Sequence, residues 1–596
     1  MFTSASRSIT WRGALLFCAG MLASSLAAAE PARPNIVLIL ADDVALMDFS
    51  AYGGEAHTPN IDALAEQGVL FANYHTTPMC APSRAMLLTG MDNHLTGVAT
   101  IPEVLPPEHR GQPGYSMYLE PGVETIAARL QPLGYRTLMT GKWHLGHGPG
   151  QLPNHHGFER SFVLDASGAD NWEQRPYLPF YRTAPWFEDG APATLPEDFY
   201  SSAFIVDKML EYIEEGQPAR QPFLAYLAFQ AVHIPVQAPR EFSDNYRGVY
   251  DDGWQALRTE RWQRARDRGL VPEDSALAPI HPALADWSAL NEAERQLFSR
   301  RMEVNAGMIE AMDHHIGRFI EYLRLQGLYD NTLFVVTSDN GPEAADPVDS
   351  AAMRLWLQLV GYDATTVETL GEPGSYGFIG PAWASAAAGP SDLFKFYSGQ
   401  GGLRVPLIIA GPGIAPDKLQ PAFAIAADIA PTLLDLVQQP VAEAMTGRSL
   451  LPLLRGEADR VYPPDVATGI ETAGNAALFR GDFKLVRNLP PYGDGEWKLY
   501  NLARDPGETR DLARTEPALF AQMQRDYADY ARRVGVLEMP PGYESLQQLH
   551  ANSLRVLAAN YWLLLLICVA VLLLLLAVLW RILAGFKITG RTRAVR

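Results

Sequence analysis

Residues 35–43 read Asn-Ile-Val-Leu-Ile-Leu-Ala-Asp-Asp, an apolar run that ends in two adjacent carboxylates. A second run, residues 332–340, reads Thr-Leu-Phe-Val-Val-Thr-Ser-Asp-Asn and also ends in acidic and amide side chains. Short continuous runs that are rich in β-branched residues are typical of strands buried on both faces in a parallel sheet. Residues 222–229 and 405–410 have a similar composition.

Amphipathic segments with helical periodicity separate these runs, at residues 60–67, 123–132, 203–215 and 302–326. Alternation of strands and helices predicts an α/β fold with a large, mostly parallel sheet that is flanked by helices. Residues 342–394 interrupt the alternation, and we expect them to form an insertion near the functional site.

The sequence pattern of the chain changes after about residue 456. Residues 480–486 and 497–502 predict two paired strands joined by a turn-rich loop, and a helix is expected over 516–534. We therefore expect a small C-terminal subdomain made of an antiparallel sheet and one helix.

Both ends of the chain carry apolar segments. Residues 1–29 combine two arginines, an apolar run and Ala27-Ala28-Ala29, which is typical of a secretory signal peptide. Residues 556–580 contain no charged side chain, and about 20 apolar residues are enough to span a bilayer. The segment after them carries basic but no acidic residues, and basic flanks stay on the cytoplasmic side.

These two apolar segments predict a protein that is anchored in the membrane by its C-terminal helix, so the membrane is an expected partner. The catalytic domain is expected outside the cytosol, at the inner membrane and facing the periplasm, with a cytoplasmic C-terminus. The expected order is a signal peptide at 1–29, a catalytic domain at 30–455, a subdomain at 456–539, a linker at 540–556, a transmembrane helix at 557–580 and a basic tail at 581–596.

Composition excludes two classes of protein. The 596 residues carry a net charge of −19, which argues against a nucleic-acid partner because such proteins need a basic surface. Hydrophobic residues make up 48% of the chain, so wholesale disorder is excluded. Of three cysteines, Cys18 and Cys568 lie in the terminal apolar segments, and Cys80 stands alone in the body without a partner for a disulfide.

The acidic pairs at the two strand ends predict a metal site. In open parallel sheets, ligands bind beyond the carboxyl ends of the strands, so Asp42, Asp43, Asp339 and Asn340 would meet if the two strands are neighbours. Three carboxylates repel one another unless a cation neutralises them. An all-oxygen ligand set suits Ca²⁺ or Mg²⁺ better than Zn²⁺, and its crowding favours Ca²⁺.

Cys80-Ala81-Pro82-Ser83-Arg84, followed by Leu87-Leu88-Thr89-Gly90, resembles the signature of type I sulfatases. These are formylglycine-dependent arylsulfatases of the alkaline-phosphatase-like superfamily, and the overall pattern is most similar to bacterial alkyl/aryl sulfatases. The resemblance extends to residues 34–43, 57–62, 141–146, 233–237, 338–341, 395–402 and 497–509.

The resemblance implies that a dedicated maturation enzyme oxidises Cys80 to formylglycine. The hydrated aldehyde would act with a divalent cation to hydrolyse a sulfate ester to an alcohol or phenol plus sulfate. The implied catalytic residues are Cys80, Arg84, Lys142, His144, His233 and Lys395. The implied metal ligands are Asp42, Asp43, Cys80, Asp339 and Asn340. Gln400 stands where the family has glutamate, which is a departure from the family pattern close to Lys395.

The chemistry of the residues agrees with this interpretation. A sulfate ester is anionic, and Lys142, Lys395 and a divalent ion supply positive charge to its oxygens. His144 and His233 have side chains that can exchange protons near neutral pH.

Other functions stay open at this point. A phosphonate monoester hydrolase or phosphodiesterase of the same superfamily would use a similar metal site. An inactive protein that keeps the fold for binding, or a thiol hydrolase using Cys80 and a histidine, are alternatives from other classes. Aryl, alkyl and carbohydrate sulfates are all compatible with the motifs.

Overall fold

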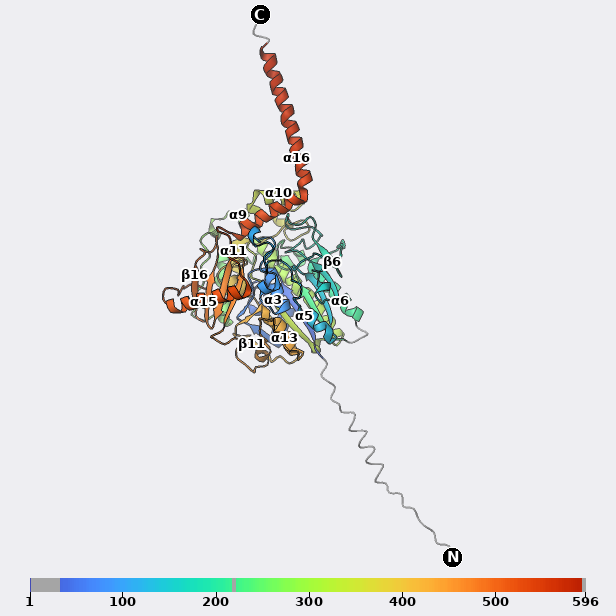
Figure 1. Ribbon diagram of the computed structural model, residues 1–596, viewed down its shortest axis with the longest axis vertical. Coiled ribbons are helices and arrows are strands. Elements are labelled where there is room, and N and C mark those ends of the chain that lie inside the picture. The colour runs from blue at the N-terminus through green and yellow to red at the C-terminus, as the bar shows by residue number, and fades with distance from the viewer. Residues whose placement is uncertain (2–32, 217–220, 592–596) are drawn as a thin grey trace.

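A computed structural model describes Met1 and residues 33–216 and 221–591 (Figure 1). Apart from Met1, the predicted signal peptide at 1–29 lies outside the described residues. The described chain forms a body of sheets and helices, from which one long C-terminal helix extends.

A ten-stranded mixed sheet forms the centre of the body, in the order β11-β2-β10-β9-β1-β8-β4-β5-β6-β7. Its central strands β9, β1, β8, β4 and β5 are mutually parallel, whereas β10, β6 and β7 join antiparallel neighbours. The expected α/β fold is confirmed, with a parallel block at the centre and antiparallel pairs towards the edges. The strands are β1 (Asn35–Ala41), β2 (Gly68–Phe71), β4 (Arg136–Lys142), β5 (Arg160–Leu164), β6 (Trp186–Glu188), β7 (Ala191–Pro192), β8 (Phe223–Ala228), β9 (Thr332–Ser338), β10 (Leu407–Ala410) and β11 (Asp417–Gln420).

The two runs that predict the fold are neighbours in this sheet. All seven residues of β1 are buried, as are all seven of β9, which explains their continuous apolar composition. The strands pair in parallel from Asn35 opposite Thr332 to Ala41 opposite Ser338. This register brings residues 42 and 339, the first after each strand, to the same edge.

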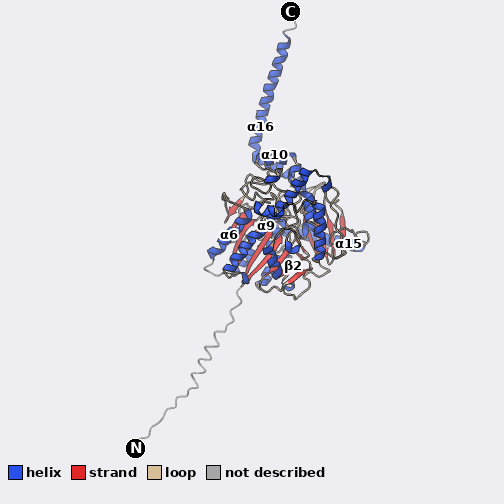
Figure 2. Cartoon of the chain, turned by 180° about the vertical axis from the view of Figure 1, so that it is seen from behind, coloured by secondary structure: helices blue, strands red, loops and turns tan. Residues whose placement is uncertain are grey.

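Helices pack on the sheet, as the view from behind shows (Figure 2). Helix α6 (Ser201–Gly216) contacts β4 and β8, and α9 (Glu292–Leu325) packs along α6. Helix α9 begins earlier than its apolar pattern predicts, because Asn291 and Glu294 form a reciprocal capping box at its start.

A second sheet of four antiparallel strands lies in the C-terminal part of the body, in the order β13-β14-β15-β16. Helix α15 (Pro517–Val534) packs against it through a cluster that includes Leu478, Leu499 and Met523. The strands are β13 (Ala467–Thr472), β14 (Asn475–Arg480), β15 (Phe483–Arg487) and β16 (Trp497–Asn501). The boundaries given above for the domains stay predictions.

The expected insertion at 342–394 contains α10 (Ala351–Leu359) and α11 (Gly380–Ala387). Met353 and Leu357 of α10 join a small apolar cluster with Tyr177 and Ile234, which lies apart from the main core.

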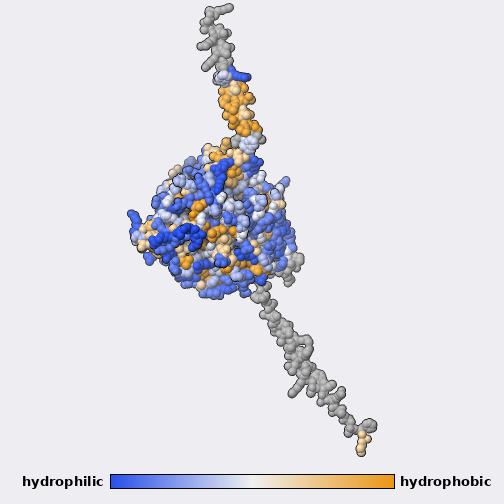
Figure 3. All heavy atoms as spheres, in the orientation of Figure 1, coloured by the Kyte–Doolittle hydropathy of each residue, from blue (hydrophilic) through white to orange (hydrophobic). Residues whose placement is uncertain are grey.

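The C-terminal helix α16 runs without interruption from Ser545 to Arg591 (Figure 1). Its first turns pack on the body, and apolar side chains gather along part of the helix beyond it (Figure 3). Within the described part of the chain, no helix has an apolar stretch long enough to cross a membrane. The predicted transmembrane helix at 557–580 and the membrane-anchored location inferred from it are therefore wrong, and the membrane partner inferred from the same helix is not shown. The apolar run is the continuation of a helix whose beginning is polar and is bound to the body.

Candidate active site

The acidic pairs after β1 and β9 meet at one edge of the sheet. The backbone N–H of Asp43 donates a hydrogen bond of 3.2 Å to Asp339 Oδ1, and Asn340 Nδ2 donates one of 2.5 Å to Asp43 Oδ1. Asp42, Asp43, Asp339 and Asn340 are all buried. The structure thus brings the four predicted metal ligands together, as expected for residues at the carboxyl ends of neighbouring parallel strands.

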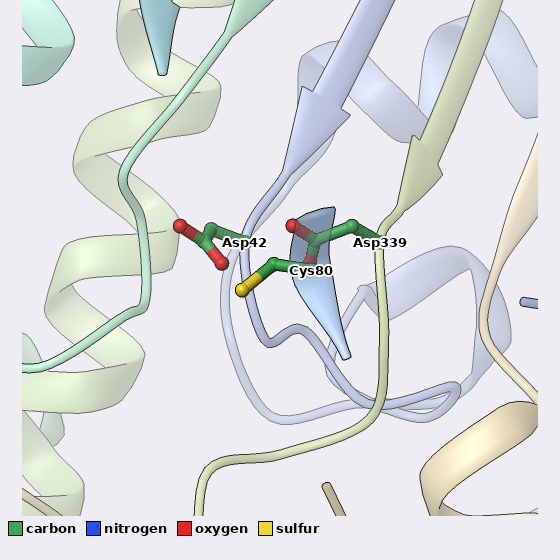
Figure 4. A group of neighbouring side chains, drawn as sticks. All are labelled: Asp42, Cys80 and Asp339. Carbon is green, nitrogen blue, oxygen red and sulfur yellow. The ribbon is translucent and has the colours of Figure 1, made fainter. Parts of the chain in front are cut away.

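Cys80 is the first residue of α3 (Cys80–Thr89) and is fully buried. One ligand atom each of Asp42, Cys80 and Asp339 lies within 4.8 Å of the others, and Figure 4 shows the three side chains converging. Burial raises the pKa of the Cys80 thiol to about 11. A thiol that stays protonated is a poor nucleophile, which disfavours the thiol-hydrolase alternative.

Arg84 lies one turn after Cys80 and holds the acidic residues in place. Its Nε donates to Asp339 Oδ2 over 2.9 Å, and its Nη2 lies 2.7 Å from the same oxygen. Its Nη1 donates to the backbone carbonyl of Lys142 over 2.7 Å. Because Arg84 is fully buried and occupied with these partners, its geometry is that of a positioning residue.

Two buried lysines from distant parts of the sequence contact the acidic cluster. Lys142, the last residue of β4, places Nζ 2.6 Å from Asp42 Oδ2. Lys395 places Nζ 2.8 Å from Asp43 Oδ1 and 2.8 Å from Glu343 Oε2. Glu343 was not among the predicted site residues. It follows the Ser338–Gly341 motif closely, but no residue pattern indicates its contact with Lys395.

The two predicted histidines also lie at this edge. His233 Nδ1 donates to the carbonyl of Ile234 over 2.7 Å, and its Nε2 lies 3.9 Å from Asp43 Oδ2. Neither ring nitrogen of the buried His144 has a hydrogen-bond partner within the described chain. Burial and the neighbouring lysines hold the pKa of both imidazoles well below the usual histidine value, which favours their neutral form.

Gly168 makes the position of His233 possible. A Cβ atom at residue 168 would lie 2.5 Å from His233 Nδ1, closer than packed atoms approach. Only glycine therefore allows this backbone to pass beside the imidazole.

The surroundings shift the pKa values of the site carboxylates in different directions. Burial raises the pKa of Asp42 well above its ordinary value and that of Asp43 to about 6. Burial acts on Asp339 in the same direction, but Arg84 and the two lysines outweigh it and lower the pKa of Asp339. Four carboxylates, including Glu343, face three basic groups, which leaves one uncompensated negative charge when all are ionised.

The residues fit a hard divalent cation. Asp42 Oδ1 and Asn340 Oδ1 are buried oxygens that have no hydrogen-bond partner among the residues described. Buried polar atoms are rarely left unsatisfied, so these two oxygens are available as ligands. The donor set is dominated by carboxylate and amide oxygen, which matches the preference of Ca²⁺ and Mg²⁺.

Gln400, the departure from the family pattern, does not contact Lys395 through any described bond. Its Oε1 lies 3.0 Å from His75 Nε2, and burial lowers the pKa of His75 to about 3. Its backbone N–H donates to Glu508 Oε2 over 2.7 Å. A neutral amide therefore pairs with a neutral imidazole, and the contacts of Lys395 with Asp43 and Glu343 are kept.

A cavity of about 480 Å³ opens onto this site. Cys80, His233, Glu343 and Lys395 line one part of it, and side chains of α10 and α16 line another. The volume falls within the range of about 300–1,000 Å³ that is usual for small-molecule sites.

Comparisons with known proteins find related chains along most of this sequence. The family model described as Sulfatase matches residues 34–439, and the one described as N-sulphoglucosamine sulphohydrolase, C-terminal, matches residues 395–526. An uncharacterized sulfatase of Schizosaccharomyces pombe is 35% identical, covering 86% of this chain and 96% of the relative. An arylsulfatase of Klebsiella aerogenes is 34% identical, covering 74% of this chain and 95% of the relative.

Solved structures share the fold. The PsFucS1 sulfatase from Pseudoalteromonas sp. is 19% identical, with a TM-score of 0.55 over 89% of this chain and 96% of that one. A structure in complex with its substrate, D-glucosamine-2-N,6-O-disulfate, is 21% identical, with a TM-score of 0.56 over 84% of this chain and 98% of that one.

Proposed function

Because the chain belongs to the sulfatase family and is a sulfuric ester hydrolase, we propose that the reaction takes place at position 80 beside a divalent cation. The observation that carries the proposal is the convergence of Cys80 with Asp42 and Asp339 within 4.8 Å, at a site where Lys142 and Lys395 form ion pairs with the acidic residues. A formylglycine formed from Cys80 by a maturation enzyme would, as its hydrate, supply a hydroxyl that attacks sulfur while the bond from sulfur to the alcohol oxygen breaks. The alcohol would leave with a proton, and the second hydroxyl would then expel sulfate and restore the aldehyde.

We assign the cation site to Asp42, Asp43, Asp339 and Asn340, with residue 80 adjacent. The unpaired oxygens of Asp42 and Asn340 support this assignment. Bound Ca²⁺ would supply positive charge to a sulfate oxygen, and the crowded oxygen set favours Ca²⁺ over Mg²⁺, which demands a more regular geometry.

The charges of the site suit a sulfate monoester. When the described carboxylates and basic groups are all ionised they leave one negative charge, and a bound divalent cation would change this to one positive charge. A sulfate monoester carries a single negative charge, so the loaded site and the substrate would neutralise each other. Lys142 and Lys395 are fixed by ion pairs before substrate arrives, which is the preorganisation that lowers the barrier for charge development.

The histidines are suited to proton transfer. Since the carbonyl of Ile234 can only accept, His233 Nδ1 carries a hydrogen and Nε2 is the nitrogen that exchanges a proton with the substrate. His144 has both nitrogens free of partners in the described residues, which leaves it available to the leaving group or to the nucleophile at position 80. Arg84 acts indirectly, by fixing Asp339 and the carbonyl of Lys142.

The test compares activity with the chemical state of residue 80. The protein is purified from a host with and without a formylglycine-generating enzyme, and turnover of 4-nitrophenyl sulfate is measured together with the mass of the peptide that ends at Arg84. We expect activity in proportion to the aldehyde content and none in Cys80→Ala. Equal activity of the matured and the unmatured protein would contradict the proposal. Turnover of a matched phosphonate monoester at a higher kcat/KM would favour the other hydrolase of the superfamily.

A further inference from the structure

We propose that the cavity selects a monosulfate ester whose alcohol part is apolar, and that the first turns of α16 form part of the wall that contacts it. The inference rests on the proposed reaction at position 80, and it adds the class of alcohol. It follows from which side chains line the cavity, how α16 is held, and which charges are present.

The part of the cavity away from the acidic cluster is lined by two helical faces. Met353 and Trp356 of α10 are three residues apart and so lie on one face of that helix. Leu546, Leu549 and Leu557 of α16 share a face in the same way. Both views of the molecule show α10 beside the start of α16 (Figures 1 and 2). An apolar group entering the cavity would bury surface against both helices.

The start of α16 is fastened to the body. Asn552 is 1% exposed, and its Nδ2 donates to the carbonyls of Glu103 over 3.0 Å and of Leu105 over 2.9 Å. Arg110 Nη2 donates to Asn552 Oδ1 over 2.7 Å, and the hydroxyl of Tyr543 donates to the carbonyl of Val104 over 2.8 Å. These bonds satisfy a buried amide completely, so the leucines of α16 are presented on a fixed wall.

The charges of the lining disfavour a substrate with further anionic groups. Lys395 is the one lysine or arginine among the described lining residues, and it is paired with Asp43 and Glu343. The other acidic lining residues are Glu103, Asp346 and Asp349, and the lining histidines are His233 and His550. A second sulfate or a carboxylate would meet these carboxylates with no further lysine or arginine among the described lining residues to balance it. A polysulfated saccharide therefore fits this cavity less well than a monosulfate with an apolar alcohol.

The experiment measures kcat/KM for primary alkyl sulfates from butyl to decyl, each below its micelle-forming concentration, with 4-nitrophenyl sulfate as the reference. We expect kcat/KM to rise with chain length by up to about fourfold per methylene, the limit set by complete burial. D-glucosamine-2-N,6-O-disulfate should be a poorer substrate than octyl sulfate.

Two pairs of variants locate the effect. Trp356→Ala should lower kcat/KM for decyl sulfate by about 10- to 100-fold relative to butyl sulfate. Leu355→Ala is the control on the same helix, because Leu355 is 57% exposed. Leu549→Ala should flatten the chain-length dependence, whereas Gln547→Ala on the exposed side of α16 should not. Thermal unfolding of each variant checks that it is folded.

The outcomes separate this inference from the proposed function. Hydrolysis of 4-nitrophenyl sulfate with no dependence on alkyl chain length, or a preference for the disulfated sugar, would overturn the apolar class. A chain-length dependence that survives Leu549→Ala unchanged would overturn the role of α16. If the matured protein hydrolyses no sulfate ester in the set, the proposed function fails, and this inference fails with it.

Discussion

Lys142 Nζ lies 2.6 Å from Asp42 Oδ2, and both side chains are fully buried. The pair joins the end of β4 to the end of β1 and leaves Asp42 Oδ1 free of hydrogen-bond partners among the described residues. One carboxylate can thus contact a fixed cation through one oxygen and a metal ion through the other. The site is arranged before any ligand binds.

Replacing Lys142 by methionine should remove a preorganised cation while keeping much of the apolar volume. We expect kcat/KM for 4-nitrophenyl sulfate to fall by about 10²–10³, because such a group acts on charge that develops in the transition state. Steady-state kinetics with Lys498→Met, which removes a half-exposed lysine paired with Asp494, is the control. Near-normal kcat/KM in Lys142→Met would refute the assigned role.

Removal of the cation should affect both activity and stability. Chelation is expected to abolish turnover, and addition of Ca²⁺ should restore it and raise the Tm, because a ligand that binds only the folded state stabilises it. Asp43→Asn should weaken the effect of Ca²⁺ on Tm, and Asp267→Asn, on an exposed side chain of α8 (Gly253–Asp267), should leave it unchanged. Zinc found at one equivalent per chain, with no response to Ca²⁺, would contradict the oxygen-ligand site.

The position of His233 should depend on the absence of a side chain at residue 168. Gly168→Ala places a Cβ where His233 Nδ1 lies 2.5 Å away, so the imidazole must move. A displacement of about 1 Å in a catalytic group can cost about 10²-fold in rate, and we expect a loss of this order in kcat. Gly122→Ala strains a left-handed backbone (φ +91°) but meets no atom within 4 Å, so it controls for a loss of stability without a clash. Equal kcat values in the two variants would show that His233 does not require this contact.

Stability should depend on pH through a buried pair outside the active site. His94 Nε2 lies 2.7 Å from Glu471 Oε2. Burial by itself would lower the pKa of His94, but the hydrogen bond to Glu471 and the charges of Glu471 and Asp92 outweigh it, so the pKa of His94 is raised. A raised folded-state pKa means that the pair stabilises the fold fully below about pH 6.5, the ordinary histidine value, and that this stabilisation is lost as pH rises through the raised value.

Denaturant unfolding at pH values from about 5 to about 9, a range that spans the ordinary pKa of histidine, measures this effect. The free energy of unfolding of the wild type minus that of His94→Gln should be largest at acid pH and should shrink as pH rises. Where the pair is charged, removing one partner should cost about 3–5 kcal/mol. His155→Gln, on an exposed side chain, should show no such trend. A difference that is constant with pH would contradict a charged His94.

Sequence patterns predicted the elements that carry the strongest local signals. The buried runs at β1 and β9 could be identified because both faces of each strand are covered, and the acidic pairs after them could be placed because parallel strands end at one edge. The segment Cys80–Gly90 could be recognised because its residues are contiguous.

Contacts made by loops and by distant segments could not be predicted in this way. Glu343 reaches Lys395 across a loop whose path has no periodicity, and Gly168 lies beside His233 only because two separate loops converge. The antiparallel pairing of β10 with β2 and β9 joins strands that are far apart in the chain.

The C-terminal helix gave the wrong prediction for a similar reason. The apolar run after residue 556 has a strong local signal, but Asn552 and its bonds to Glu103 and Leu105 link the start of that helix to the body. Hydropathy counts apolar residues in a window and contains no information about such a tertiary contact.

The proposed reaction depends most on the chemical state of residue 80, which the mass of the peptide that ends at Arg84, taken from fully active protein, measures. We expect an aldehyde at position 80 in a fraction of molecules that matches the fraction titrated by a tight-binding sulfate-ester analogue. Full activity from protein whose residue 80 is entirely an unmodified thiol would contradict it.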